Sequence, residues 1–61
     1  MASIKQMVEE IIFKNNLTQK EFALRYGFEE SQVARWLAEK TQPRVGTYIK
    51  IKEVYDKLGN G

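Results

Sequence analysis

Two capping boxes fix where the first two helices of this chain begin. Ser3 is followed three residues later by Gln6, and Thr18 is followed at the same spacing by Glu21. In such a pair each side chain hydrogen-bonds to the backbone N–H of the other residue, which satisfies two free donors at a helix N-terminus. The first helix is therefore confined between Ser3 and Thr18, and the chain is expected to fold from short helical segments.

Apolar residues at helical spacing follow both capping boxes and continue to the end of the chain. The expected helices run from Ile4 to a stop at Asn15–Asn16, from Thr18 to Tyr26, from about Glu30 to Ala38, and from Val45 or Thr47 to Leu58. The expected inward-facing residues are Ile4, Met7, Val8, Ile11, Ile12, Phe22, Ala23, Tyr26, Val33, Trp36, Leu37, Tyr48, Ile51, Tyr55 and Leu58. Gly27 is expected to end the second helix at positive φ. The sequence predicts an all-α, compact bundle of four or five helices.

The small size of the chain argues against an enzyme. A domain of 61 residues buries only about 60% of the surface that its unfolded chain exposes, which leaves no room for a deep substrate cavity. The chain has no His and no Cys, so the commonest general base, the thiolate nucleophile and the usual zinc ligands are missing. We expect one domain over residues 1–58 with a flexible tail at 59–61, no enzymatic activity, no cofactor and no metal.

The beginning of the chain carries no uninterrupted apolar run, which predicts neither a signal peptide nor a membrane span. The absence of Cys also fits a reducing compartment. We therefore expect a cytoplasmic protein that is associated with the nucleoid and does not contact a membrane.

Positive charge gathers in the second half of the chain. The net charge is only +2, which alone is a weak argument for a polyanionic partner. The basic residues between positions 35 and 52 are Arg35, Lys40, Arg44, Lys50 and Lys52, and the one acid there is Glu39. Residues 1–34, in contrast, carry slightly more acidic than basic side chains. A nucleic-acid partner and an ordinary solvated face are both consistent with this pattern.

Two short helices, Thr18–Tyr26 and Glu30–Ala38, meet across a tight turn that contains Gly27. This is the helix-turn-helix layout, in which the second helix enters the major groove of DNA. Helix pairs are also common in small α-bundles. Only the residue types at particular positions can distinguish a DNA-binding helix-turn-helix from an ordinary helix pair.

The segment LTQKEFALRYGFEESQVARWLAEKTQPRVGTYIKI resembles the Cro/repressor-type, or XRE, helix-turn-helix family. The matching positions are Leu17, Thr18, Gln19, Glu21, Phe22, Ala23, Gly27, Val33, Arg35, Trp36, Pro43, Tyr48 and Ile51. The resemblance covers residues 17 to about 55 and implies a lambda-repressor-like fold. The chain departs from the family pattern at Glu29 and Arg44, where capping Ser or Thr residues are common, and at Lys52, where a small apolar residue is usual.

The resemblance implies two sets of DNA-contacting side chains. Those expected to contact base edges are Glu30, Ser31, Gln32 and Arg35, and those expected to bind phosphates are Thr18, Gln19, Lys20, Lys40, Thr41 and Arg44. Ser31 and Arg35 are four residues apart and share one helix face. Other roles stay open: Arg35 can pair with Glu39 one turn later, Gln19 can serve as an ordinary capping aid, and Glu30 can compensate the charge at the helix end.

The resemblance therefore implies a repressor-type regulator of transcription from a bacterium, phage or plasmid, which binds double-stranded DNA sequence-specifically. It would be a weak homodimer, or would form a dimer on a two-fold symmetric operator. The alternative is a protein-interaction module, of antitoxin or anti-regulator type, that keeps the fold without specific DNA binding. Its partner would bind through Phe13 and the C-terminal helix. Phe13 lies about 180° from Ile4 around the first helix, so either the last helix covers it or it belongs to a partner surface.

Overall fold

The structure, a computed structural model, describes residues 3–59 of the chain. These residues form four helices, α1 (Ile4–Lys14), α2 (Gln19–Tyr26), α3 (Glu30–Leu37) and α4 (Val45–Gly59), and they contain no β-strand. The predicted all-α bundle is confirmed, with four helices in the described part of the chain. α4 includes Gly59, the first residue of the expected tail, and residues 60–61 of that tail lie outside the described residues.

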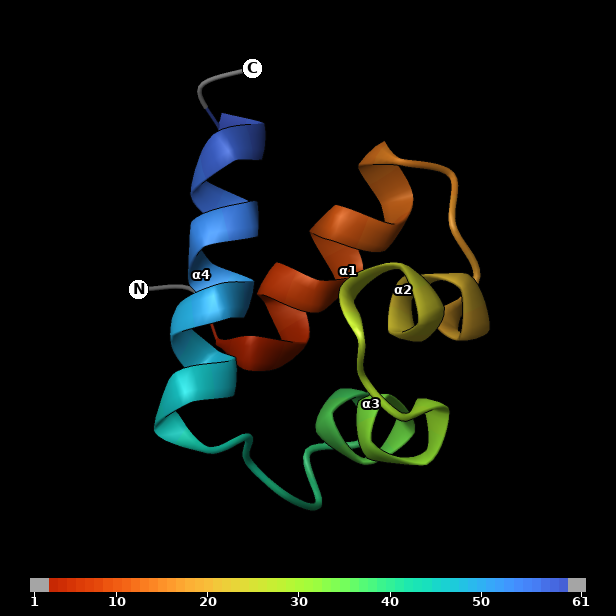
Figure 1. The fold of residues 1–61 in the computed structure, drawn as a ribbon, viewed down its shortest axis with the longest axis vertical. Coiled ribbons are helices and arrows are strands. Elements are labelled where there is room, and N and C mark those ends of the chain that lie inside the picture. Colours follow the sequence, from red (N-terminus) through yellow and green to blue (C-terminus); the bar gives the residue numbers. More distant parts are fainter. Residues whose placement is uncertain (1–2, 60–61) are drawn as a thin grey trace.

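α1 occupies the middle of the bundle (Figure 1). α4 packs along one side of α1, and α2 and α3 lie on the other side. α3 contacts both α1 and α2, so its orientation is set by two neighbours at once. α3 lies at the edge of the molecule, away from the C-terminal half of α4 (Figure 1).

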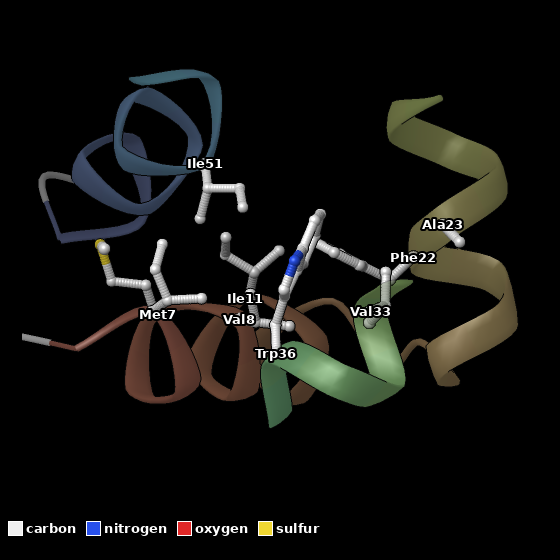
Figure 2. Close-up of a cluster of buried hydrophobic side chains, with 9 residues drawn as sticks. Met7, Val8, Ile11, Phe22, Ala23, Val33, Trp36 and Ile51 are labelled. Carbon is white, nitrogen blue, oxygen red and sulfur yellow. The ribbon is translucent and has the colours of Figure 1, made fainter. Parts of the chain in front are cut away.

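Nine apolar side chains from all four helices form the core. They are Ile4, Met7, Val8, Ile11, Phe22, Ala23, Val33, Trp36 and Ile51. Figure 2 shows Trp36 of α3 and Ile51 of α4 meeting the α1 side chains. All nine were expected to face inward, and the other expected core residues are partly buried and pack against them. Burying each large side chain contributes about 1.5–3 kcal/mol, so these residues supply most of the stability of the fold. The helical periodicity of the sequence was sufficient to identify them.

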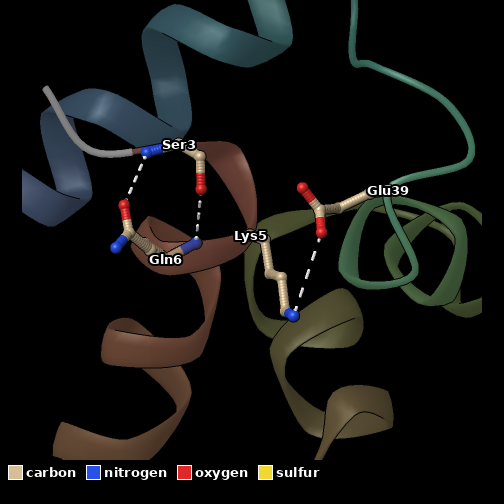
Figure 3. Close-up of polar contacts among 4 residues, drawn as sticks. All are labelled: Ser3, Lys5, Gln6 and Glu39. Carbon is tan, nitrogen blue, oxygen red and sulfur yellow. Dashed lines mark hydrogen bonds and ion pairs between the residues drawn. The ribbon is translucent and has the colours of Figure 1, made fainter.

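Both predicted capping boxes are present. Ser3 Oγ accepts from the Gln6 N–H at 3.2 Å, and Gln6 Oε1 accepts from the Ser3 N–H at 3.0 Å (Figure 3). The corresponding distances between Thr18 and Glu21 are 3.1 and 2.8 Å. These bonds satisfy donors that the helix itself cannot pair, and they fix the first residues of α1 and α2.

The first three helices end in the same way, with one residue at positive φ that turns the chain out of the helix. These residues are Asn16 (φ 54°), Gly27 (φ 78°) and Glu39 (φ 61°). The N–H of the next residue then donates to the carbonyl five positions earlier, at 2.9, 2.8 and 2.9 Å respectively. The predicted stop at Asn15–Asn16 and the predicted positive φ of Gly27 are confirmed. Nothing in the sequence pointed to Glu39, which is an unusual residue in this conformation.

Glu39→Gly is expected to stabilise the fold by about 1 kcal/mol. The left-handed conformation costs a residue with a side chain roughly 1–2 kcal/mol, and a carboxylate at a helix C-terminus opposes the helix dipole. The substitution removes both penalties. It loses an exposed ion pair, in which Glu39 lies 3.9 Å from Lys5 (Figure 3), and it increases the conformational entropy of the unfolded chain by a smaller amount. Thermal unfolding measures the effect, since 1 kcal/mol corresponds to about 4–8 °C in a domain of this size. Asn16→Gly is the matched control and should change less, because Asn tolerates this region. A lower Tm for Glu39→Gly would contradict the assignment of strain to this residue.

Lys52 is exposed on α4 and donates to Asp56, one turn later, at 3.1 Å. This hydrogen bond raises the pKa of Lys52 above its ordinary value. Any stability that the raised pKa of Lys52 reflects is present at neutral pH and is lost as the pH rises through that pKa. In the described part of the chain, no helix has the length and apolar character needed to cross a membrane.

Candidate nucleic-acid interface

The turn of residues 27–29 joins α2 to α3 and sets the angle between them. Gly27 adopts the left-handed conformation that ends α2. Phe28 then donates its N–H to the carbonyl of Ala23 at 2.8 Å. Glu29 is extended (φ −93°, ψ 137°) and precedes the first residue of α3. The backbone alone therefore defines a compact connection between the two helices.

Aromatic side chains pack this connection from within. The ring centroids of Phe22 and Phe28 lie 5.6 Å apart, and Phe28 meets Trp36 edge-on at 5.4 Å. The ring centroids of Tyr26 and Phe22 lie 5.2 Å apart, with the rings tilted. Tilted and edge-on pairs at these distances are the arrangements that aromatic rings prefer. The contacts tie α2, the turn and α3 into one unit.

Lys50 of α4 contacts the same turn from outside. Its Nζ donates to the Tyr26 carbonyl at 2.8 Å and lies 5.3 Å from the centroid of the Phe28 ring. A cation at the C-terminus of α2 interacts favourably with the helix dipole, and the ring face adds a cation–π attraction. Lys50 thereby links α4 to the turn that orients α3. The sequence identified it only as one basic residue among several.

The exposed face of α3 lies opposite its buried stripe. Val33 and Trp36 are buried. At 100° per residue, Ser31 and Arg35 point away from them, with Glu30 and Gln32 to either side. All four predicted base-contacting side chains are exposed, and one helix carries them together. Ala34 is also exposed on this face. We did not predict it, although its spacing from Glu30 and Ser31 was visible in the sequence.

Arg35 forms no ion pair within the described part of the chain. The alternative pairing with Glu39, one turn later, does not occur, and Glu39 lies 3.9 Å from Lys5 instead. Glu30 does not pair with Arg35 either. The guanidinium is therefore an exposed, unpaired cation in the centre of the α3 face.

The N-terminus of α3 lacks a side-chain cap. Glu29 occupies the capping position but accepts no hydrogen bond there, which agrees with the poor preference of Glu for this role. Its charge, together with that of Glu30 in the first turn, still compensates the positive end of the helix dipole. Two carboxylates thus border the α3 face at its first turn.

The predicted phosphate-binding residues lie in two separate segments, and all of them are exposed. Thr18, Gln19 and Lys20 form the N-terminal end of α2, where Thr18 Oγ1 already accepts from the Glu21 N–H. Lys40, Thr41 and Arg44 lie in the connection between α3 and α4. One segment precedes α3 in the sequence and the other follows it, so the six residues do not form one continuous stretch.

A groove joins the second of these segments to α3. Its volume is about 330 Å³, and its lining includes Gln32, Trp36, Gln42 and Arg44. The structure therefore brings one predicted base-contacting residue and one predicted phosphate-binding residue to the same depression. Gln42 also lines the groove. It was not predicted from the sequence, because nothing distinguishes it from the other polar residues of its loop.

Two short helices joined by a tight turn, with a polar exposed face on the second, have the layout of a helix-turn-helix. Comparison with protein families agrees, because the model of a family described as Helix-turn-helix matches residues 4–58. The chain therefore belongs to the XRE helix-turn-helix family, which confirms the resemblance noted in its sequence. Comparisons with curated proteins and with solved structures gave no match.

Proposed function

We propose that this chain is a sequence-specific regulator of transcription that contacts the major groove of double-stranded DNA with α3. The observation that carries the proposal is the exposed α3 face, with the unpaired guanidinium of Arg35 at its centre. Such a protein works in the cytoplasm, where it associates with the nucleoid.

Each side chain of the α3 face suits a base edge. Arg35 donates bidentately to O6 and N7 of a guanine, and Ser31 can donate or accept. Glu30 accepts from the N4 amino group of cytosine, and Gln32 pairs with adenine. The methyl group of Ala34 suits the methyl group of thymine. Together these roles define a short half-site that contains at least one guanine.

Phosphate contacts supply much of the affinity in this proposal. Gln19 and Lys20 lie in the first turn of α2, where backbone N–H groups and the helix dipole favour an anion. Lys40, Thr41 and Arg44 contact the backbone on the other side of α3. One α3 covers only a few base pairs, so two copies bind a two-fold symmetric operator, as a weak homodimer or as a dimer that forms on the DNA.

Duplex binding should weaken steeply as the salt concentration rises, because each neutralised phosphate lowers log K by about 0.9 per unit of log salt. Lys40→Ala should lower this slope by about one and weaken binding to all sequences alike. Fluorescence anisotropy with a labelled duplex, between about 50 and 200 mM salt, measures both effects. A flat response for the native chain would count heavily against DNA binding.

A protein-interaction module of antitoxin or anti-regulator type is the second candidate. The exposed Phe13, the net charge of only +2 and the adjacent carboxylates Glu29 and Glu30 favour it. Such a module would bind a protein through Phe13 and α4 and would show no preference among DNA sequences. A gel shift against genomic fragments at a fixed salt concentration separates the two candidates.

A further inference from the structure

A groove between α1 and α4 lies outside the face assigned to DNA. Its volume is about 370 Å³, and it is lined by Gln6, Glu9, Glu10 and Phe13 of α1 and by Tyr55 of α4. The C-terminal halves of α1 and α4 lie at the opposite end of the molecule from α3 (Figure 1). A chain that binds DNA through α3 therefore leaves this groove open to another molecule.

Two aromatic side chains from different helices border the groove. Phe13 is 80% exposed, so α4 does not cover it. This excludes the first of the two explanations that the sequence allowed for Phe13. Tyr55 is partly buried and packs against the core, which holds its ring at the groove wall. The two rings supply apolar area and negative π faces, which attract cations.

The charged residues that line the groove are both acidic. Glu9 and Glu10 form no ion pair in residues 3–59, and no basic side chain belongs to the lining. Along α1, Lys5 and Lys14 each lie four residues from one of these glutamates and about 90° around the helix from the centre of the groove face. On α4, Lys52 precedes Tyr55 by one turn and pairs with Asp56. The carboxylates repel phosphate and favour a cation, so the groove and the α3 face suit partners of opposite charge.

We propose that this groove binds an arginine side chain presented by an apolar segment of a partner protein. A planar guanidinium can pair bidentately with a carboxylate and also stack on an aromatic ring, whereas a lysine ammonium acts as a point charge. The volume is near the lower end of the roughly 300–1,000 Å³ found for ligand clefts, which suits one or two side chains. The proposal does not depend on DNA binding, because it uses no residue of the α3 face.

The test uses blocked heptapeptides with one central arginine between leucines, and the same peptides with citrulline, the uncharged isostere. Backbone amide NMR of the whole chain follows each titration. The arginine peptide is expected to shift the signals of Glu9, Glu10, Phe13 and Tyr55 saturably and to bind about tenfold or more tightly than the citrulline peptide, because charged hydrogen bonds are the stronger ones. Equal binding of the two peptides, or shifts confined to Glu29 and Glu30, would overturn the proposal.

Variants then locate the contacts. The double variant Glu9→Gln with Glu10→Gln, and separately Phe13→Ala, should each weaken the arginine peptide about tenfold. These side chains are exposed, so the melting temperature should stay near that of the native chain. Glu53→Gln is the matched control, because Glu53 is exposed on α4 and does not line the groove. The affinity for duplex DNA should not fall in the groove variants or in the control. A self-association by light scattering that the groove variants abolish would assign the groove to a second copy and refute the proposal.

Discussion

Trp36→Ala is expected to remove most of the free energy that stabilises the folded chain. Trp36 is only 5% exposed and contacts both the core and the turn through Phe28. Truncating a buried Trp costs about 3–5 kcal/mol. Stability of about 0.05–0.15 kcal/mol per residue leaves little reserve in a chain of 61 residues. Circular dichroism against temperature should show a Tm lower by at least about 12 °C, and DNA binding should disappear with the fold.

Trp36→Phe is the control for this effect. The indole Nε1 is buried and finds no hydrogen-bond partner among the described residues. Phe keeps a ring in the core and removes this unpaired donor, whose burial is costly. The loss should therefore be clearly smaller than for Ala. A Trp36→Ala chain that melts within a few degrees of the native chain would contradict the central place of this residue in the core.

Arg35→Ala should have the opposite pattern, with native stability and weakened binding. Arg35 is exposed and unpaired in the middle of α3, and Ala is the best helix former. Loss of a bidentate contact to guanine should cost about 1–3 kcal/mol on the cognate site, or about 5–150-fold in Kd. Discrimination at one base pair should also flatten. Binding curves recorded beside thermal melts measure both quantities.

Arg25→Ala is the matched control for Arg35→Ala. Arg25 is also exposed and lies in the last turn of α2, so the change removes the same charge outside the α3 face. It should leave the preference for the cognate base pair intact. If Arg35→Ala binds its operator as tightly as the native chain does, the base-contacting role of this helix face fails at its central residue.

Local patterns in the sequence were sufficient to predict most of the fold. The Ser3 and Thr18 capping boxes depend on residues three positions apart, and Gly27 marks its turn because glycine tolerates positive φ. The burial of Val33 and Trp36 in turn determined which side of α3 is exposed. Such features follow from helix geometry, so they can be read without any knowledge of long-range contacts.

Features that depend on tertiary contacts could not be predicted. The bond from Lys50 to the Tyr26 carbonyl joins residues 24 positions apart, and no local pattern announces it. The positive φ of Glu39 contradicts its residue preference, because the end of α3 must turn the chain toward α4. The sequence also left open whether α4 covers Phe13, since that depends on how α4 packs against α1. Which bases α3 contacts depends on the geometry of its complex with DNA, which no local sequence pattern determines.

Selection from a pool of randomised duplexes tests the central claim most directly. The native chain and the Arg35→Ala variant are each taken through several rounds of binding at physiological salt, and the recovered duplexes are sequenced. The native chain is predicted to enrich a two-fold symmetric site, with half-sites about one helical turn or a multiple of it apart. Arg35→Ala should lose the preference for guanine at one position of each half-site. Recovery of duplexes with no sequence preference by the native chain would contradict sequence-specific recognition by α3.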